Sequence, residues 1–316
     1  MSEIFLAVAV FVVGIVIMAY CSNKAVKNSV HFASAIGISP FLIGLIVVSL
    51  GTDFPEIINS IISSSMGHAD LNVGNCIGSI LAQFTIILGL LPLIGRSFRV
   101  KKREVFVSGI CLLLSLIVVF STLEKGYVTR LNAFFLIGSW PIYIMLTHFL
   151  IRGKSKAKVN LSHPDKSHIY YAAIAIAGFI GVAIGSYMVI QAIISLSDIF
   201  GIPELILGFF LASIGTSLPE LVVGLAAVRS KQYEVAIGEI IGSCIVDATV
   251  AIGTGLFLFP QTISAGLASI TTLITMGASG VVILLLALIG KVDRKTGVFL
   301  IALYLSASIL VETLLI

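Results

Sequence analysis

Ten long apolar stretches run along this chain and restrict what it can fold into. They lie at residues 3–22, 41–65, 71–95, 105–121, 131–151, 170–197, 204–228, 235–259, 265–290 and 297–315. Each is long enough for an α-helix to cross the ~30 Å hydrocarbon core of a bilayer. Only 11% of the residues are charged, whereas roughly 25% are charged in soluble domains. Because helices satisfy their own backbone hydrogen bonds in lipid, we expect an all-α membrane protein with ten transmembrane helices.

The positive charges fall almost entirely in alternate loops. The loops after the first, third, fifth, seventh and ninth stretches hold 17 of the 19 Lys and Arg residues, and only Lys125 and Arg130 lie in the other loops. Positive residues favour the cytoplasmic side of a membrane. We therefore expect a multi-pass protein of the cell membrane with both termini extracellular. Since topology accounts for the net charge of +4, this charge does not indicate nucleic acid binding.

The longest polar stretch, residues 152–168, divides the chain into two parts. Residues 1–151 and residues 169–316 each contain five of the apolar stretches, and the linker between them carries basic residues. An odd number of spans in the first part reverses the orientation of the second part in the membrane. We therefore expect two inverted five-helix repeats joined by a cytoplasmic linker.

A shift of 164 residues aligns the two parts without a gap. Between residues 41–90 and 205–254 it gives twelve identities in fifty positions, nearly all of them small, polar or helix-breaking residues. The identical residues of the first part are Gly44, Ser49, Gly51, Thr52, Pro55, Glu56, Gly74, Ile77, Gly78, Ser79, Thr85 and Gly89. The apolar surroundings differ, as lipid-facing surfaces can. The duplication therefore preserves the residues that break helices and carry oxygen atoms.

Two pairs of apolar stretches are interrupted at corresponding places. Gly51-Thr-Asp-Phe-Pro-Glu56 corresponds to Gly215-Thr-Ser-Leu-Pro-Glu220, and a Gly-x-x-x-Gly-Ser segment follows in each part. Such paired interruptions indicate the midplane binding site of a transporter. A proline removes a helical hydrogen bond, so carbonyl oxygens can face a cavity. We expect broken helices 2, 3, 7 and 8, with backbone oxygens near Ser49 and Ser213 as ligands.

The interrupted segments also gather hard oxygen ligands. Five acids lie in them, namely Asp53, Glu56, Glu220, Glu239 and Asp247, together with the neutral residues Thr52, Thr216, Ser79, Ser217, Ser243, Asn75 and Gln83. A charged residue at the centre of a membrane helix costs roughly 2.5–3.5 kcal/mol, so five acids without a function are not expected. Ca2+ binds 6 to 8 oxygens including carboxylates, whereas zinc or copper favours His and Cys. The pattern predicts a site for a hard cation.

Helical spacing brings these groups to common faces. Asn75, Ser79 and Gln83 follow one another at four-residue intervals, and Glu239, Ser243 and Asp247 repeat the pattern. Small polar residues at this spacing also occur where helices simply pack closely, so the serines alone do not indicate a site. The acids favour a site. Five carboxylates in a small volume repel one another, and we expect states without bound cations to carry protons on some of them.

These residues resemble the repeats of the cation/Ca2+ exchanger superfamily, and most closely those of its prokaryotic Na+/Ca2+ exchanger branch. The similarity implies that Glu56 and Glu220 are the principal Ca2+ ligands. It further implies that Thr52, Thr216, Ser79, Ser243 and Asp247 line the ion sites, and that helices 1 and 6 slide against the remaining eight. Three residues depart from the family pattern: Asp53 replaces Ser, Glu239 replaces Asn, and Gln83 replaces Asn or Asp.

The sequence thus predicts a secondary antiporter that exchanges Na+ for Ca2+ by alternating access, with transported ions but no cofactor. A Ca2+/H+ or K+-dependent antiporter on the same fold is the nearest alternative, because extra acids can couple to another ion. An intramembrane enzyme is disfavoured because no His-Glu-x-x-His motif is present. A channel fits inverted broken helices less well. We expect a monomeric transport unit in the lipid bilayer, with its four cysteines in packing roles.

Overall fold

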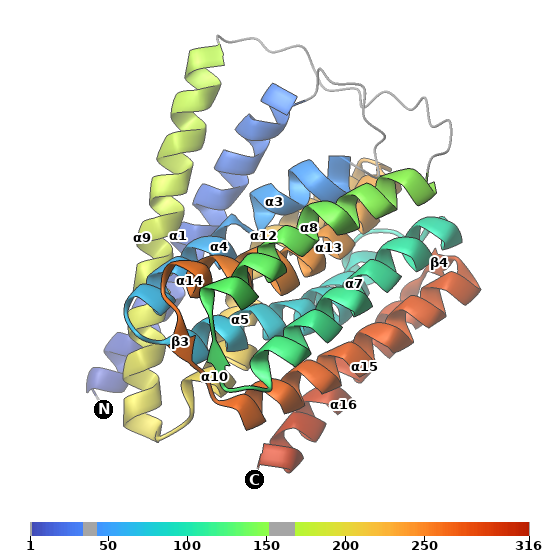
Figure 1. Cartoon of the computed structure of the whole chain (residues 1–316). Coiled ribbons are helices and arrows are strands. Elements are labelled where there is room, and N and C mark those ends of the chain that lie inside the picture. Colours follow the sequence, from blue (N-terminus) through green and yellow to red (C-terminus); the bar gives the residue numbers. More distant parts are fainter. Residues whose placement is uncertain (1, 34–42, 152–167, 316) are drawn as a thin grey trace.

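The computed structural model describes residues 2–33, 43–151 and 168–315, and the described part is almost entirely helical (Figure 1). With η denoting π-helix, the first part contains α1 (Ser2–Ala33), η1 (Ile43–Val48), α3 (Ser49–Thr52), α4 (Phe54–Ser65), α5 (Ala69–Ala82), η2 (Gln83–Ile87), α6 (Leu88–Ile94), β1 (Phe98–Arg99), α7 (Lys102–Leu123), β2 (Tyr127–Val128) and α8 (Arg130–Ile151). The second contains α9 (His168–Phe200), α10 (Glu204–Leu207), η3 (Gly208–Ala212), α11 (Ser213–Thr216), α12 (Leu218–Arg229), α13 (Tyr233–Val246), η4 (Asp247–Ala251), α14 (Ile252–Leu258), β3 (Gln261–Thr262), α15 (Ala265–Ile289), β4 (Lys291–Val292) and α16 (Arg294–Leu315).

Nine segments in the described part of the chain are long and apolar enough to cross a membrane. They confirm the predicted class of an all-α membrane protein. The second predicted span begins at residues 41–42, outside the described residues, and its described remainder, Ile43–Ser65, is not among the nine. The total of ten therefore stays a prediction. The predicted linker also lies outside the described residues, apart from His168, with which α9 begins.

The secondary structure repeats at the offset that aligns the sequence. The bounds of α3, α4, α5, η2 and α6 recur 164 residues later as those of α11, α12, α13, η4 and α14. The interruption in spans 2 and 7 is a break in the helix before the proline, at Asp53 and Ser217. In spans 3 and 8 it is a π-helical stretch, which starts at Gln83 and Asp247 and keeps the helix continuous. A π-helix widens the turn and is common at functional sites.

The two interrupted spans that begin at α5 and α13 form the centre of the bundle. In their most apolar windows 78% and 94% of the residues are buried, whereas the corresponding figure for α1 is 22%. Glycines allow the neighbouring helices to approach closely. A Cβ atom on Gly74 or Gly78 would lie 2.1 Å from a backbone oxygen of α10 or η3, and one on Gly242 would lie 2.5 Å from a backbone oxygen of η1. Each central helix therefore packs against the broken span of the other repeat.

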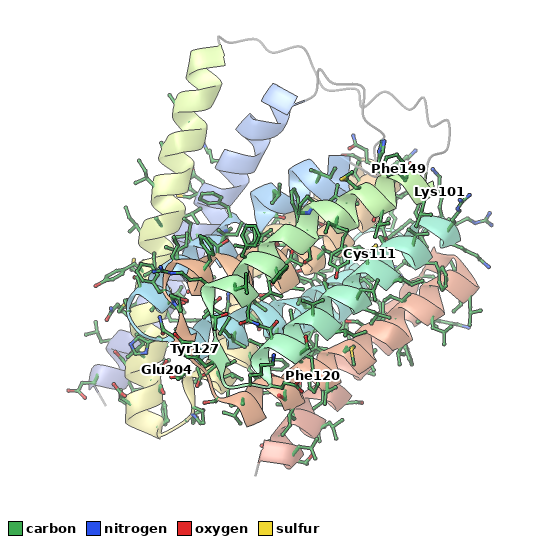
Figure 2. All side chains as sticks on the ribbon, in the orientation of Figure 1. Lys101, Cys111, Phe120, Tyr127, Phe149 and Glu204 are labelled. Atoms are coloured by element: carbon green, nitrogen blue, oxygen red, sulfur yellow. The ribbon has the colours of Figure 1, made fainter. Side chains whose placement is uncertain are left out.

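Two short strand pairs close the ends of the bundle. β1 pairs with β4, with Phe98 opposite Val292, and β2 pairs with β3, with Val128 opposite Gln261. Figure 1 shows β4 and β3 at opposite ends. Figure 2 likewise shows Lys101 at one end, and Tyr127 and Glu204 at the other. Each strand pair therefore joins a loop of the first repeat to a loop of the second.

The pair formed by α1 and α9 lies at one side of the bundle, at an angle to most other helices (Figure 1). The two helices meet at glycines: a Cβ atom on Gly185 would lie 2.7 Å from the backbone oxygen of Gly14. α1 is longer than the predicted first span and continues to Ala33. Near the middle of α1, Ile15 packs against the broken span of the second repeat. A Cβ atom on Gly215 of α11 would lie 2.2 Å from Ile15 Cδ1.

Candidate cation site

The candidate site is built around the two helix breaks. Asp53 and Ser217 have φ and ψ angles of −76° and 3°, and −83° and 9°, which end α3 and α11. Each break is followed within two residues by a proline near the start of the next helix. Pro55 lacks the N–H group that would bond the carbonyl of Gly51 four residues earlier. The break therefore turns short polar side chains and the following Glu56 towards the interior.

All five predicted carboxylates are fully buried, with 0% exposure. One ligand oxygen from each of Asp53, Glu56 and Glu220 lies within 4.8 Å of the other two. Neither oxygen of these three side chains has a hydrogen-bond partner. Glu56 and Glu220 come from opposite repeats, and Asp53 adds a third acid that the second repeat lacks. The structure thus brings three of the predicted acids into one cluster with free oxygens.

Hydroxyl groups connect the two repeats around this cluster. Thr52 Oγ1 lies 3.3 Å from Ser243 Oγ, and Ser79 Oγ lies 3.5 Å from Thr216 Oγ1. These contacts correspond to each other under the 164-residue offset. Thr216 also donates a hydrogen bond to Asn75 Oδ1 at 3.2 Å. The predicted neutral ligands of the two repeats therefore face one another at the same level.

Gln83 and Asp247 occupy equivalent positions and bond directly to each other. Gln83 Nε2 donates to Asp247 Oδ2 at 3.1 Å and to Ser217 Oγ at 3.4 Å. The thiol of Cys244 donates to Gln83 Oε1 at 3.5 Å. These bonds orient the Gln83 amide so that it approaches Asp247 as a donor, which leaves Asp247 Oδ1 without a partner. A cation next to Asp247 would find that oxygen free.

Glu239 is not one of the three acids whose oxygens lie within 4.8 Å of one another. Its Oε2 is 3.7 Å from the position of a Cβ atom on Gly224, in the half of α12 that leads away from Glu220 towards Arg229. Both of its oxygens are buried and have no partner. The sequence placed Glu239 on the same stripe as Ser243, and both residues lie in α13, one helical turn apart.

The backbone oxygens predicted near Ser49 and Ser213 are already bonded within the helix. Ser49 O accepts from the N–H of Asp53 at 2.9 Å and from Thr52 Oγ1 at 3.1 Å. Ser213 O accepts from the N–H of Ser217 at 3.1 Å and from Thr216 Oγ1 at 3.4 Å. In this arrangement both oxygens would have to share or exchange hydrogen bonds to bind a cation.

One buried polar residue beside the site was not predicted from the sequence. Asn59 is 1% exposed, and neither its Oδ1 nor its Nδ2 has a hydrogen-bond partner. Its spacing of three residues from Glu56 could have indicated a shared helix face. The repeat comparison hid it, because the corresponding residue of the second half is Val223.

The arrangement is suited to binding a hard cation. Buried carboxylate and hydroxyl oxygens from both repeats surround a small volume, and among the described residues the group of close ligand atoms contains no histidine or cysteine. Three carboxylates this close would repel one another strongly if all were ionised without a cation, since the interior screens charge poorly. A divalent cation with one further positive charge, or three monovalent cations, would balance them.

The chain is similar to proteins from one family. Residues 6–149 and 170–311 match the family described as Sodium/calcium exchanger protein. The Inner membrane protein YrbG of Escherichia coli is 30% identical, over 81% of either chain. The Sodium/calcium exchanger MaX1 of Methanosarcina acetivorans is 24% identical over 94% of this chain and 96% of its own length. A solved structure of the sodium-calcium exchanger NCX_Mj superposes with a TM-score of 0.66 at 25% identity, covering 96% of this chain and 98% of that one.

Proposed function

We propose that this chain, which belongs to the sodium/calcium exchanger protein family, moves Ca2+ against Na+ across the cell membrane by alternating access. The family and its fold are those of transporters rather than enzymes, and the ions are transported substrates rather than cofactors. The observation that carries the proposal is the cluster of unpartnered oxygens from Asp53, Glu56 and Glu220 at the two helix breaks.

In this proposal the two repeats share one site. Glu56 and Glu220 are the principal Ca2+ ligands, and the facing hydroxyls complete the coordination with Asp247. Additional lining residues are Thr52, Thr216, Ser79, Ser243, Asn75, Ser217 and Gln83. Na+ competes for the same oxygens, since a carboxylate that loses Ca2+ needs another cation in a low-dielectric interior. This competition links the two fluxes in opposite directions.

The proposal includes an inverted arrangement of the repeats with the termini outside. It is supported by the positions of the strands: β1 and β3 follow equivalent spans of the two repeats but lie in different strand pairs, at opposite ends of the bundle, and the same holds for β2 and β4. It is also supported by the basic loops, because Lys101 forms an ion pair with Glu234 at 2.7 Å, and β1 pairs with β4, whose loop carries Lys291, Arg294 and Lys295. These loops converge at one end, where the positive charges would face the cytoplasm.

Alternating access would come from movement of α1 and α9 against the other helices. The support is their position at one side of the bundle and the close approach of α1 to Gly215, two residues before the break at Ser217. Ile15 covers this break, so a shift of α1 along the bundle would change which end of the site is open. A channel would need no such cover.

The test is ion flux into proteoliposomes. Ca2+ uptake should require an outwardly directed Na+ gradient and should stop when K+ replaces Na+ on both sides. Uptake driven by a pH gradient in the complete absence of Na+ would refute Na+ coupling. Heat-inactivated protein in the same lipid serves as the control for leak.

Coupling to H+ or K+ is the second candidate, because Asp53 adds a carboxylate where the family pattern has Ser. With three acids in the cluster, one Ca2+ leaves a charge of −1 that a proton or a monovalent cation could balance. The same flux measurement with Na+, K+ and H+ gradients applied one at a time separates the candidates.

A further inference from the structure

A polar face extends from the cluster along α4 towards the loop that joins α4 to α5. Asn59, Ser60 and Ser63 follow Glu56 by three, four and seven residues, which places them on the same side of the helix. All four residues are at most 1% exposed. Neighbours at this spacing have Cβ atoms about 5–6 Å apart. A line of buried oxygen atoms therefore leads away from Glu56.

The hydrogen bonds leave these oxygens available as ligands. Ser63 Oγ donates to the backbone oxygen of Asn59 at 2.6 Å, so the lone pairs of its hydroxyl remain free. Ser60 Oγ accepts from the N–H of Gly255 at 3.0 Å, which fixes its position. Asn59 Oδ1 and Nδ2 have no partner. A buried polar group without a partner has lost its hydration without compensation, so an amide with both atoms unpaired points to a bound species.

A second unpaired group lies on the helix that packs against α4. Ser186 of α9 is fully buried, and its Oγ has no partner. It lies one turn before Ile190, which packs in one apolar cluster with Ile62 of α4. Ser186 thus lies on the buried side of α9, a helix that packs against α4.

The second repeat has no such polar face. The residues that correspond to Asn59, Ser60 and Ser63 are Val223, Gly224 and Ala227, and Ser64 is replaced by Val228. The helices that follow the two breaks are therefore chemically different, although the residues at the two helix breaks are nearly the same.

We propose that Asn59, with the hydroxyl oxygens of Ser60 and Ser63 and one oxygen of Glu56, forms a station for a monovalent cation, one helical turn outside the three-acid cluster. Neutral amide and hydroxyl oxygens with a single carboxylate match the charge of an alkali cation, whereas Ca2+ sites normally contain several carboxylates. The station exists on one side of the membrane only, the side of the loop after α4. It rests on the proposed function, in which that side is extracellular.

The test compares the two sides of the membrane in proteoliposomes that contain the chain in one orientation. Asn59→Val, which copies the second repeat, should raise the Na+ concentration for half-maximal exchange on the side of the α4–α5 loop by about fivefold, the equivalent of ~1 kcal/mol. The value on the opposite side should stay unchanged. Ser65→Ala, an exposed change on the same helix, is the matched control and should alter neither value.

Binding is also measured without transport, as the rise in unfolding temperature that Na+, K+ or Li+ produces in detergent. This rise should be smaller in Asn59→Val than in the wild type. Asn59→Thr keeps an oxygen atom, so its rise should lie between those of the valine variant and the wild type. The threonine variant also provides the test if the valine variant folds poorly. Equal effects on both sides, or an unchanged response to every alkali cation, would show that the amide binds only water and overturn the station. If the wild type lacks Na+-driven Ca2+ flux, the proposed function fails, and the alkali-cation response still decides about the station.

Discussion

Replacing Asp53 by Asn should stabilise the ion-free protein and weaken its response to Ca2+. Asp53 lies with Glu56 and Glu220 in a cluster whose ligand oxygens are within 4.8 Å of one another. Asparagine keeps the shape of the side chain and removes its charge. The second repeat has Ser217 at the position of Asp53, so this substitution leaves the equivalent pair Glu56 and Glu220 in place.

The magnitude follows from the spacing of the carboxylates. At 4.8 Å and an effective dielectric constant of ~20, two ionised groups repel each other by about 3.5 kcal/mol. Asp53 takes part in two such pairs, so at this distance its removal would relieve about 7 kcal/mol if all three groups were ionised. Protons taken up by the empty cluster reduce this value. Bound Ca2+ cancels the same repulsion, and its stabilising effect should therefore be larger in the wild type.

Thermal unfolding in detergent measures both effects. Cys76, Cys111 and Cys244 are buried free thiols, so a dye that fluoresces on reaction with a thiol reports unfolding. In a chelator the midpoint for Asp53→Asn should exceed that of the wild type by several degrees, and the further rise on adding Ca2+ should be smaller. Equal midpoints with an equal rise on adding Ca2+ would show that Asp53 does not share the electrostatic field of the two glutamates, and the reasoning would be wrong.

Further predictions concern the repeated pair of acids, Glu56 and Glu220, and the helix crossings. Glu56→Gln or Glu220→Gln should reduce Ca2+ flux to the leak level while the protein stays folded, and wild-type flux in either variant would refute the assigned roles. Gly78→Ala should destabilise the protein by about 1–3 kcal/mol, because the new Cβ atom would overlap a backbone oxygen of η3. Gly277→Ala, where a Cβ atom meets nothing within 4 Å, is its control and should be neutral in the same unfolding assay.

Much of this fold could be predicted because the bilayer limits the choices. Length and hydropathy were sufficient to find the nine spans that the described residues contain, and the duplicated motif was sufficient to indicate the family, which the comparisons confirm. The charged residues at the centre of these spans stood out, because apolar neighbours gave them no packing role. The three acids in one cluster were thus all among the predicted ligands.

The finer geometry could not be predicted, because it depends on contacts between the repeats. Whether an interruption becomes a break or a π-helical turn depends on the backbone. Pro55 removes a hydrogen-bond donor and the helix breaks, whereas the residues from Gln83 keep their N–H groups and form a π-helix. The surroundings of Glu239 include Gly224, a residue of another helix. Asn59 escaped notice because a comparison of identical residues discards the positions at which the repeats differ.

The strand pairs at the two ends of the bundle have a consequence for how such a protein is made. Each pair takes one strand from each repeat, and each central helix packs on the broken span of the other repeat. A newly synthesised first half therefore lacks the strands that pair with β1 and β2, and it lacks the ligands that the second repeat contributes to the site. Its buried acids and amide must stay near water or the insertion machinery until the last helices arrive, so assembly of the site is a late step of biosynthesis.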